Sequence, residues 1–232
     1  MSGLGDLGVK SNLVCCGSTR LTRLGAMRNS AIPAIILAAG ASRRLGQPKQ
    51  LVRVGGETLL DRTIRVVRDA GVDEVFVVLG AHSESIAANA NLKTVHPIIN
   101  RNWEEGIATS IHAGVWAVKE VRSTAEAAML LVCDQPRLSS RHLRALMNAH
   151  ASASEPTIAA STYAGTLGIP AIFPAGQFGS LLALCGDAGA RLLLRDTECP
   201  LVAVPFAGGE VDVDTPADLA AMAAFSNERR SL

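Results

Sequence analysis

Short, unbroken apolar runs alternate along this chain with longer stretches in which apolar residues recur at helical spacing. The runs Ala34–Ala39, Val75–Leu79 and Ala128–Cys133 have the pattern of strands that are buried on both faces of a parallel sheet. Weaker strand patterns occupy Lys93–Ile99, Thr157–Ser161, Ala171–Phe173 and Leu201–Val204.

Helical periodicity fills the intervals between these runs. Leu59, Ile64 and Val67 lie on one face of a helix that Gly71 ends. Further helices are expected at about Ile107–Val121, from Ser140 (with Ser139 or Ser140 as N-cap) to Ala151, at Phe178–Leu184, at Ala188–Leu194, and from Pro216 with Thr215 as N-cap. This alternation predicts an α/β fold: a Rossmann-like three-layer α/β/α sandwich with a mainly parallel sheet.

The pattern also predicts how the chain is organised. Residues 31–226 are expected to form a single domain, because neither an internal repeat nor a long linker divides them. Residues 1–30 lack apolar periodicity and are expected to be a disordered N-terminal extension, with 227–232 as a C-terminal tail. The apolar runs are shorter than the roughly 20 residues that span a bilayer, so no membrane partner is predicted.

Composition narrows the function classes. With 22 Lys and Arg against 21 Asp and Glu, the formal charge of +1 provides no excess of cations for a nucleic acid partner. Aromatic residues make up only 3% of the chain, which argues against a surface for stacking successive bases. The five cysteines include no C-x-x-C spacing, which favours a reduced, cytoplasmic protein without a zinc site.

Candidate chemistry lies just after the apolar runs, because ligands of open parallel sheets bind at the carboxyl ends of the strands. The segment that begins at Gly40 combines small residues, which expose backbone amides, with the cations Arg43, Arg44 and Lys49. Amides and fixed positive charge form a cradle for a triphosphate. The segment matches neither G-x-G-x-x-G nor a P-loop, and the alternative interpretation is a basic surface turn.

Three carboxylates are candidate magnesium ligands. Asp134 directly follows a buried strand, where it could bind Mg²⁺ between phosphate oxygens; a helix cap or a turn is the alternative. Asp212 and Asp214 occupy alternate positions of an extended segment and therefore one side of it, so that one of them could be a second ligand. For Asp214, capping the final helix is the competing role.

Other chemistries find no support in the sequence. The five histidines are scattered, no G-x-S-x-G elbow occurs, and Cys133 is expected to be core packing inside its strand. Without a nucleophile, the set of cations, glycine amides and single carboxylates best matches in-line nucleotidyl transfer, which depends on positioning and charge neutralisation.

The segment Leu37 to Lys49 resembles the signature loop of the nucleotidyltransferases related to the molybdenum cofactor guanylyl- and cytidylyltransferases. Further stretches resemble the cytidylyltransferase branch, in family order: Leu51–Leu60, Asn100–Ser110, Val132–Pro136, Gly186–Arg191 and Val211–Asp218. The resemblance covers about Ala31 to Ala224 and implies a fold like that of the nucleotide-diphospho-sugar transferases.

Roles carried over from the resemblance fall into four groups. The residues implied to contact the nucleotide are Leu37, Ala38, Ala39, Gly40, Arg44, Lys49, Gly106 and Ser110. Gly80 is a further nucleotide-binding candidate because it directly follows a buried strand. Those implied to be catalytic are Arg44 and Lys49, which hold the phosphates, and Asp134. The implied ligands of Mg²⁺ are Asp134 and either Asp212 or Asp214. The residues implied to face the acceptor are Asp187 and Arg191, and Gln135 is a further acceptor candidate because it lies just after a buried strand.

The implied reaction joins CTP to the molybdopterin cofactor with release of pyrophosphate, and it implies a transient contact with a recipient molybdoenzyme. One rival is a cytidylyltransferase of the isoprenoid pathway, which shares Pro48 to Gln50 but usually carries His-Asp-Ala-Ala-Arg-Pro where this chain has Val132 to Arg137. A guanylyltransferase usually reads Leu-Ala-Gly-Gly, and Ala39 argues against it. The rival from another class is a non-catalytic protein that binds and delivers a finished cofactor.

Overall fold

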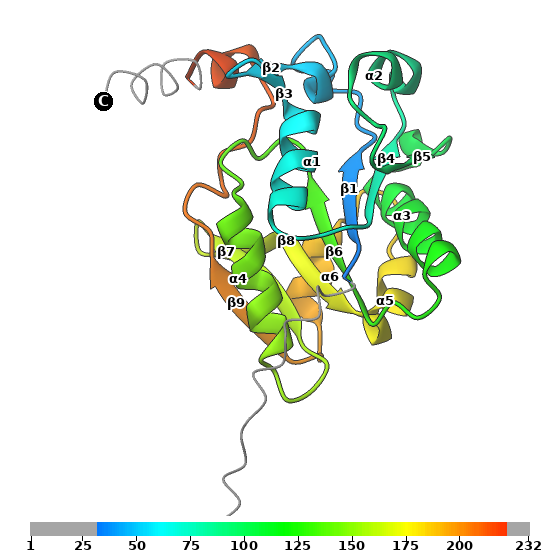
Figure 1. The fold of residues 1–232 in the computed structure, drawn as a ribbon, viewed down its shortest axis with the longest axis vertical. Coiled ribbons are helices and arrows are strands. Elements are labelled where there is room, and N and C mark those ends of the chain that lie inside the picture. Colours follow the sequence, from blue (N-terminus) through cyan, green and yellow to red (C-terminus); the bar gives the residue numbers. More distant parts are fainter. Residues whose placement is uncertain (1–31, 222–232) are drawn as a thin grey trace, which may run out of the picture.

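The computed structural model describes residues 32–221, which build a seven-stranded sheet. The strand order is β5-β4-β1-β6-β8-β7-β9. The strands are β1 (Ala34–Ala38), β4 (Val75–Leu79), β5 (His96–Ile99), β6 (Ala127–Val132), β7 (Ile158–Tyr163), β8 (Thr166–Pro174) and β9 (Leu201–Pro205). All neighbouring strands are parallel except β8, which runs antiparallel to both β6 and β7. The mainly parallel sheet is therefore confirmed (Figure 1).

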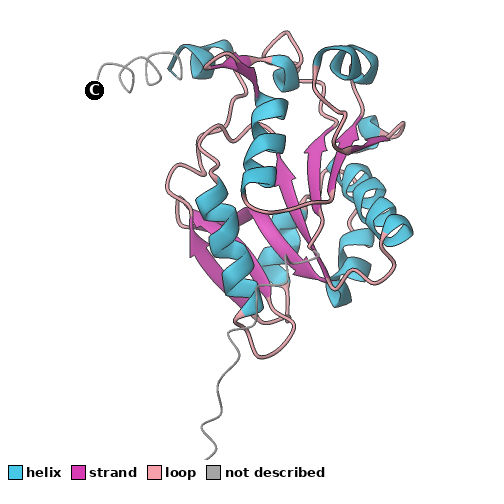
Figure 2. Cartoon of the chain, in the orientation of Figure 1, coloured by secondary structure: helices cyan, strands magenta, loops and turns pink. Residues whose placement is uncertain are grey.

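Helices cover both faces of this sheet (Figures 1 and 2). They are α1 (Leu59–Asp69), α2 (Ser83–Asn89), α3 (Ile107–Val121), α4 (Ser140–Ala151), α5 (Phe178–Leu182) and α6 (Ala190–Asp196). Residues 216–221 are also helical. Short 3₁₀ turns occur at η1 (Lys49–Leu51), η2 (Trp103–Glu105) and η3 (Ala175–Gln177), and the hairpin β2 (Arg53–Val54) and β3 (Glu57–Thr58) follows η1.

Successive side chains of β1 point to opposite faces of the sheet, and each face has its own hydrophobic core. Ile36 packs in a cluster with Leu60 of α1 and Leu143 of α4. Ile35 points to the other face and packs in a cluster with Ile111 of α3. Because both faces bury apolar side chains against helices, the predicted three-layer sandwich is confirmed.

Several expected elements differ from the observed ones. The sequence pattern missed α2 and the β2-β3 hairpin, which are too short to display a period. The predicted helix Ala188–Leu194 begins later, at Ala190, after Gly189. Of the two candidate caps of α4, it is Ser139 whose side chain accepts a hydrogen bond from the His142 amide. Thr215 accepts one from the Asp218 amide at 3.3 Å, as expected of the cap of the last helix.

The predicted extension 1–30 and the tail 227–232 lie outside the described residues, so the domain limits 31–226 stay a prediction. Within residues 32–221, none of the helices is both long and apolar enough to cross a membrane.

Candidate functional site

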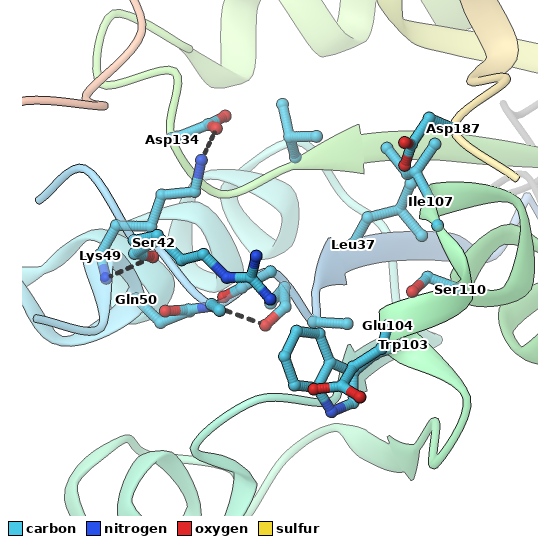
Figure 3. Close-up of a pocket in the computed structure, with 17 residues that line it drawn as sticks. Leu37, Ser42, Lys49, Gln50, Trp103, Glu104, Ile107, Ser110, Asp134 and Asp187 are labelled. Atoms are coloured by element: carbon cyan, nitrogen blue, oxygen red, sulfur yellow. Dashed lines mark hydrogen bonds and ion pairs between the residues drawn. The ribbon is translucent and has the colours of Figure 1, made fainter. Parts of the chain in front are cut away.

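A pocket of about 440 Å³ opens at the carboxyl ends of β1 and β6 (Figure 3). Strand ends, the loop after β1 and the start of α3 contribute to its wall. The lining residues are Leu37, Ala38, Ala39, Gly40, Ala41, Ser42, Arg43, Lys49, Gln50, Trp103, Glu104, Gly106, Ile107, Ser110, Val132, Asp134 and Asp187. The crossover between β1 and its two parallel neighbours produces this opening, as expected for a ligand site of an open α/β sheet.

Two side chains hold the loop after β1 in place. Gln50 is fully buried, and its amide nitrogen donates to the carbonyls of Ala38 at 2.7 Å and Gly40 at 3.0 Å. The Ser42 hydroxyl accepts a hydrogen bond from the backbone amide of Lys49 at 3.0 Å. The loop is thereby tied back onto the end of β1, and Lys49 is directed toward the neighbouring strand β6.

Lys49 lies between two carboxylates. Its Nζ donates to Oδ2 of Asp134 and, at 3.1 Å, to Oδ1 of Asp214. Burial by itself would lower the pKa of Lys49, but the charge of Asp134, its hydrogen bond and the charge of Asp214 outweigh burial and hold the pKa above its usual range. Arg44 donates to the second oxygen of Asp214 at 2.6 Å. Lys49, Arg44, Asp134 and Asp214 thus form one connected network.

The third candidate carboxylate, Asp212, makes no hydrogen bond to any side chain among residues 32–221; it is exposed and does not line the pocket. The protein around its carboxyl group desolvates it in part, and repulsion from Asp134 and Asp214 adds to this effect, so that its pKa is raised to about 6. Unlike Asp214, it is not engaged by Lys49 or Arg44 through a hydrogen bond.

These side chains fit a hard divalent cation. Oδ1 of Asp134 is buried and has no hydrogen-bond partner in the structure, which leaves it available to a ligand. Within residues 32–221 no three acidic, His or Cys side chains are close enough to enclose an ion by themselves. Magnesium typically uses one or two carboxylates and completes its shell with water and substrate phosphates, so two carboxylates suffice.

The capping alternatives for the aspartates do not describe the structure. Ser139, not Asp134, caps α4, while the backbone carbonyl of Asp134 accepts from the Val213 amide at 3.0 Å. The carboxylate of Asp214 binds cations, and it is Asp218 that accepts from the Asp214 and Thr215 amides at 3.1 and 2.7 Å. Neither the Asp134 nor the Asp214 carboxylate therefore caps a helix.

The far side of the pocket is built by a close approach of two loops. Gly106, at the start of α3, has φ of +111°, and a Cβ there would lie 2.2 Å from the carbonyl group of Gly186. The Gly186 carbonyl accepts from the Ala108 amide at 3.0 Å. This contact brings Asp187 into the lining beside Ile107, as Figure 3 shows. Ser110 completes this side, and its hydroxyl accepts from the amide of Asn100 at 3.0 Å.

Of the predicted site residues, the structure brings together in this lining Leu37, Ala38, Ala39, Gly40, Lys49, Gly106, Ser110, Asp134 and Asp187. Arg44 stays at the surface, where it contacts Asp214, and Arg43 lines the pocket instead. Gly80 lies behind the lining, because a Cβ on it would meet Trp103 at 2.6 Å. Arg191 is exposed and lies 3.4 Å from the Tyr163 hydroxyl.

Gln135 does not line the pocket either. Its side chain is buried, and its amide nitrogen donates to the carbonyls of Gly209 at 3.0 Å and Ile169 at 3.2 Å. In this structure it supports the segment that carries Asp212 and Asp214. Its predicted contact with an acceptor stays a prediction.

Sequence reasoning assigned no site role to Ser42, Gln50 or Trp103. Gln50 directly follows Lys49, and this position next to a candidate phosphate ligand could have indicated a role for Gln50 in the site. The Trp103 signal was weaker, because a single tryptophan in a polar segment gives no period. As expected, Cys133 is buried in the core, and burial raises the pKa of its thiol to about 12, so it is unreactive.

Comparison with known proteins identifies the family to which the sequence is related. Residues 34–201 match the model of the MobA-like NTP transferase domain. The chain is 32% identical over 170 residues to nicotine blue oxidoreductase of Paenarthrobacter nicotinovorans, covering 71% of this chain and 81% of that protein. It is 32% identical over 204 residues to the purine catabolism protein PucB of Bacillus subtilis, covering 82% and 95% respectively. A probable molybdenum cofactor guanylyltransferase of Opitutus terrae is 31% identical over 113 residues, 48% of this chain and 52% of that protein.

Solved structures agree with this result. The crystal structure of Rv0371c from Mycobacterium tuberculosis superposes with a TM-score of 0.73 at 30% identity, covering 84% of this chain and 98% of that one. A manganese complex of the same protein superposes with a TM-score of 0.67 at 27% identity, covering 83% and 98%.

Proposed function

Because the chain belongs to the MobA-like NTP transferase domain family, we propose that it is a magnesium-dependent enzyme that transfers CMP from CTP to the molybdopterin cofactor and releases pyrophosphate. The nucleotidyltransferase part of this proposal follows from the family. The nucleobase, the acceptor and the metal are inferences from the pocket and from the resemblance of the loop after β1.

The observation that carries the proposal is the two-sided character of the pocket. One side presents Lys49 and the carboxylate of Asp134 (Figure 3), and Arg43 also lines the pocket; these groups suit a triphosphate and its cation. The other side presents Leu37 and Ile107 with a few polar groups, which suits a nucleobase and ribose. A nucleoside triphosphate is divided in the same way, with charged phosphates at one end and a flat, less polar base at the other.

The residues that would hold magnesium are Asp134 and Asp212. Asp134 has an unpartnered buried oxygen, and Asp212 is the better second ligand because Asp214 is already bound by Lys49 and Arg44. When bound, the ion would neutralise part of the negative charge of the phosphates. The manganese complex of Rv0371c supports a divalent cation on this fold.

The side chains of the pocket then have separate tasks. Lys49 and Arg43 bind phosphate oxygens and stabilise the charge of the leaving pyrophosphate. The loop amides after Gly40 orient the triphosphate. An oxygen of the acceptor's terminal phosphate attacks the α-phosphorus while the bond to the bridging oxygen of the β-phosphate breaks. That nucleophile is already anionic, so no protein base is needed, and positioning supplies most of the acceleration.

The acceptor side of the proposal rests on Asp187, which lines the pocket beside Ile107, and on the exposed Arg191, which lies outside the lining. We also propose a cytoplasmic location and a brief contact with a recipient molybdoenzyme. The free thiols of Cys133, Cys185 and Cys199 are in keeping with a reducing compartment.

The test is an incubation of the purified chain with Mg²⁺, molybdopterin cofactor and each nucleoside triphosphate in turn, with pyrophosphate as the readout. We expect pyrophosphate with CTP in preference to GTP, and only when the acceptor is present. Release of pyrophosphate from GTP, and from none of the other three triphosphates, in the presence of the acceptor would assign the chain to guanylyl transfer. Pyrophosphate that requires a different phosphorylated acceptor would refute the molybdopterin part of the proposal.

A second candidate is raised by the relative that is named an oxidoreductase. In that case, or for a delivery protein, the same pocket would bind a finished nucleotide-containing cofactor without cleaving a phosphate bond. The discriminating result is tight binding of such a cofactor with no pyrophosphate from any of the four triphosphates.

A further inference from the structure

The polar half of the pocket is well supplied with phosphate ligands, but a nucleobase also needs a surface to pack against. Trp103 is the one aromatic residue among the described residues that line the pocket. Its side chain is half-buried, so that part of the indole stays accessible. Figure 3 shows it with Glu104 on the side away from Lys49 and Asp134. An aromatic face at this end is placed where the base of a bound triphosphate would lie.

The seat of Trp103 is made by small residues. A Cβ on Gly80 would lie 2.6 Å from Cβ and 2.7 Å from Cγ of Trp103, and 2.9 Å from Cβ of Ala39. Real Cβ atoms do not approach so closely, so only glycine at position 80 lets the indole settle against the ends of β1 and β4. Trp103 therefore reaches the pocket because of Gly80, although Gly80 itself does not line it.

A hydrogen-bond network fixes the turn that carries Trp103. Asn100 is buried; its side-chain oxygen accepts from the Asn102 amide at 3.0 Å, and its amide nitrogen donates to the hydroxyls of Thr109 at 2.9 Å and Ser110 at 3.0 Å. Thr109 also donates to the Asn102 carbonyl at 3.0 Å. The turn is thus tied to the first turn of α3, which fixes the backbone that carries Trp103.

We propose that Trp103 is the platform on which the nucleobase stacks, and that Gly80 is the positioning residue that seats it. This inference rests on the proposed function, since it assumes that a nucleoside triphosphate occupies the pocket. Stacking is tolerant of base identity, because every base has a π-face. Trp103 therefore contributes affinity for any nucleotide, and the choice between bases falls to the neighbouring groups at Ala39 and Ser110.

The chain is suited to a direct spectroscopic test, since it has only two tryptophans. Trp116 is 57% exposed on α3, does not line the pocket, and carries the Lys119 ammonium 4.7 Å from its ring centre. In a Trp116→Phe protein, Trp103 is the only source of indole fluorescence. Titration with CTP and Mg²⁺, without acceptor, should quench that emission to saturation. Pyrophosphate should not quench it, although it should compete with CTP.

Calorimetry on variants provides the second arm. Trp103→Ala should weaken CTP about 5- to 150-fold, which is the effect of losing one base-aromatic stack, and should leave pyrophosphate affinity unchanged. Trp103→Phe should recover most of the loss. Gly80→Ala should weaken CTP in the same direction by displacing the indole, and Trp116→Phe is the matched control that should bind as the wild type does.

Unchanged Trp103 emission and unchanged affinity of Trp103→Ala, in a protein that binds CTP by calorimetry, would overturn the platform and leave the proposed function intact. An equal loss of CTP and pyrophosphate affinity in Trp103→Ala would also overturn it, because that pattern indicates general damage to the pocket. Failure of the wild type to bind any nucleoside triphosphate by calorimetry would instead overturn the proposed function, and the platform with it.

Discussion

At the scale of single residues, the ammonium of Lys49 and the carboxylate of Asp134 meet from positions 85 residues apart. The sequence predicted both as site residues, because Asp134 directly follows one buried strand and Lys49 belongs to the basic, glycine-containing loop after another. It could not predict that Lys49 contacts Asp214 as well. Nor could it predict that Arg43 rather than Arg44 lines the pocket, because a loop lacks the regular geometry that would indicate which of two adjacent side chains points inward. Gln50 and Trp103 were missed for a similar reason: their roles arise from contacts with distant backbone.

Lys49→Ala should weaken both CTP and pyrophosphate. A charge-assisted contact to phosphate is worth about 1.5–3 kcal/mol, so calorimetry should show a loss of roughly 10- to 150-fold in each affinity. Lys119→Ala, which removes an equal charge from the outer face of α3, is the control and should bind normally. Arg43→Ala should cost more CTP affinity than Arg44→Ala does. If Lys49→Ala weakened only the pterin acceptor, the assignment of Lys49 to the triphosphate would be wrong.

Ala39→Gly should relax the choice of nucleobase. The Ala39 methyl lies at the base end of the pocket, close to Gly80 and Trp103, and narrows the space that a purine would need. The ratio of kcat/KM for CTP over GTP should therefore fall in the variant, by a factor that corresponds to about 1–3 kcal/mol. A wild type that prefers GTP would contradict the cytidylyl assignment.

At the scale of elements, strongly apolar strands were predicted most accurately. The strand Val75–Leu79 and the helix Ile107–Val121 have the predicted limits. A strand that is buried on both faces and a helix of several full turns each fit their apolar pattern in only one way. The antiparallel direction of β8 could not be read from the chain, since apolar runs carry no sign of strand direction. Short elements such as α2 were missed because two turns display no period.

Gly106→Ala should separate the two loops that build the far side of the pocket. The added Cβ would overlap the Gly186 carbonyl group, and φ of +111° is strained for alanine, which together cost about 1–3 kcal/mol or more. The thermal midpoint should fall by about 5 °C, and acceptor affinity should fall with the displacement of Asp187. Gly189→Ala is the matched control, because its Cβ would have only an ordinary contact, 3.6 Å from Ile107. Equal midpoints for the two variants would show that the approach at Gly106 is not needed.

The contact between α4 and β7 should make the stability of the fold sensitive to acid. His142 is buried and stacked on Phe206, and its Nε2 lies 2.8 Å from the Ser161 hydroxyl, which itself donates to the Pro170 carbonyl at 2.6 Å. Nε2 must therefore donate to the Ser161 hydroxyl. Burial lowers the pKa of His142 to about 4, which keeps the imidazole neutral near pH 7.

Since the unfolded chain protonates His142 near its ordinary pKa of 6.5 and the folded chain only near 4, the unfolded state binds more protons between these values. Stability should be complete above pH 6.5 and should fall as the pH drops toward 4, by an amount of order 3 kcal/mol. Urea unfolding of His142→Gln at pH 7 and pH 4.5 should show a smaller loss than the wild type. Identical losses would exclude His142 as the source of the acid sensitivity.

At the scale of the whole molecule, the site is a consequence of topology. The central position of β1, with parallel neighbours on both sides, brings the phosphate loop, the end of β6 and the start of α3 to one edge of the sheet. The sequence could predict this edge, since parallel strands all end there. It could not predict the path of residues 206–214, which return Asp212 and Asp214 to the same edge through contacts with Gln135 and Asp134.

The central claim is that this edge transfers a nucleotidyl group. The most direct measurement follows label from [α-³²P]CTP into the molybdopterin cofactor in the presence of Mg²⁺, with pyrophosphate counted in parallel, for the wild type and for Asp134→Asn. We predict one labelled acceptor per pyrophosphate in the wild type, and a loss of orders of magnitude in the folded variant, which lacks the carboxylate that faces the phosphates. Binding of CTP by the wild type without label transfer or pyrophosphate from any of the four triphosphates, or full activity of Asp134→Asn, would contradict the account.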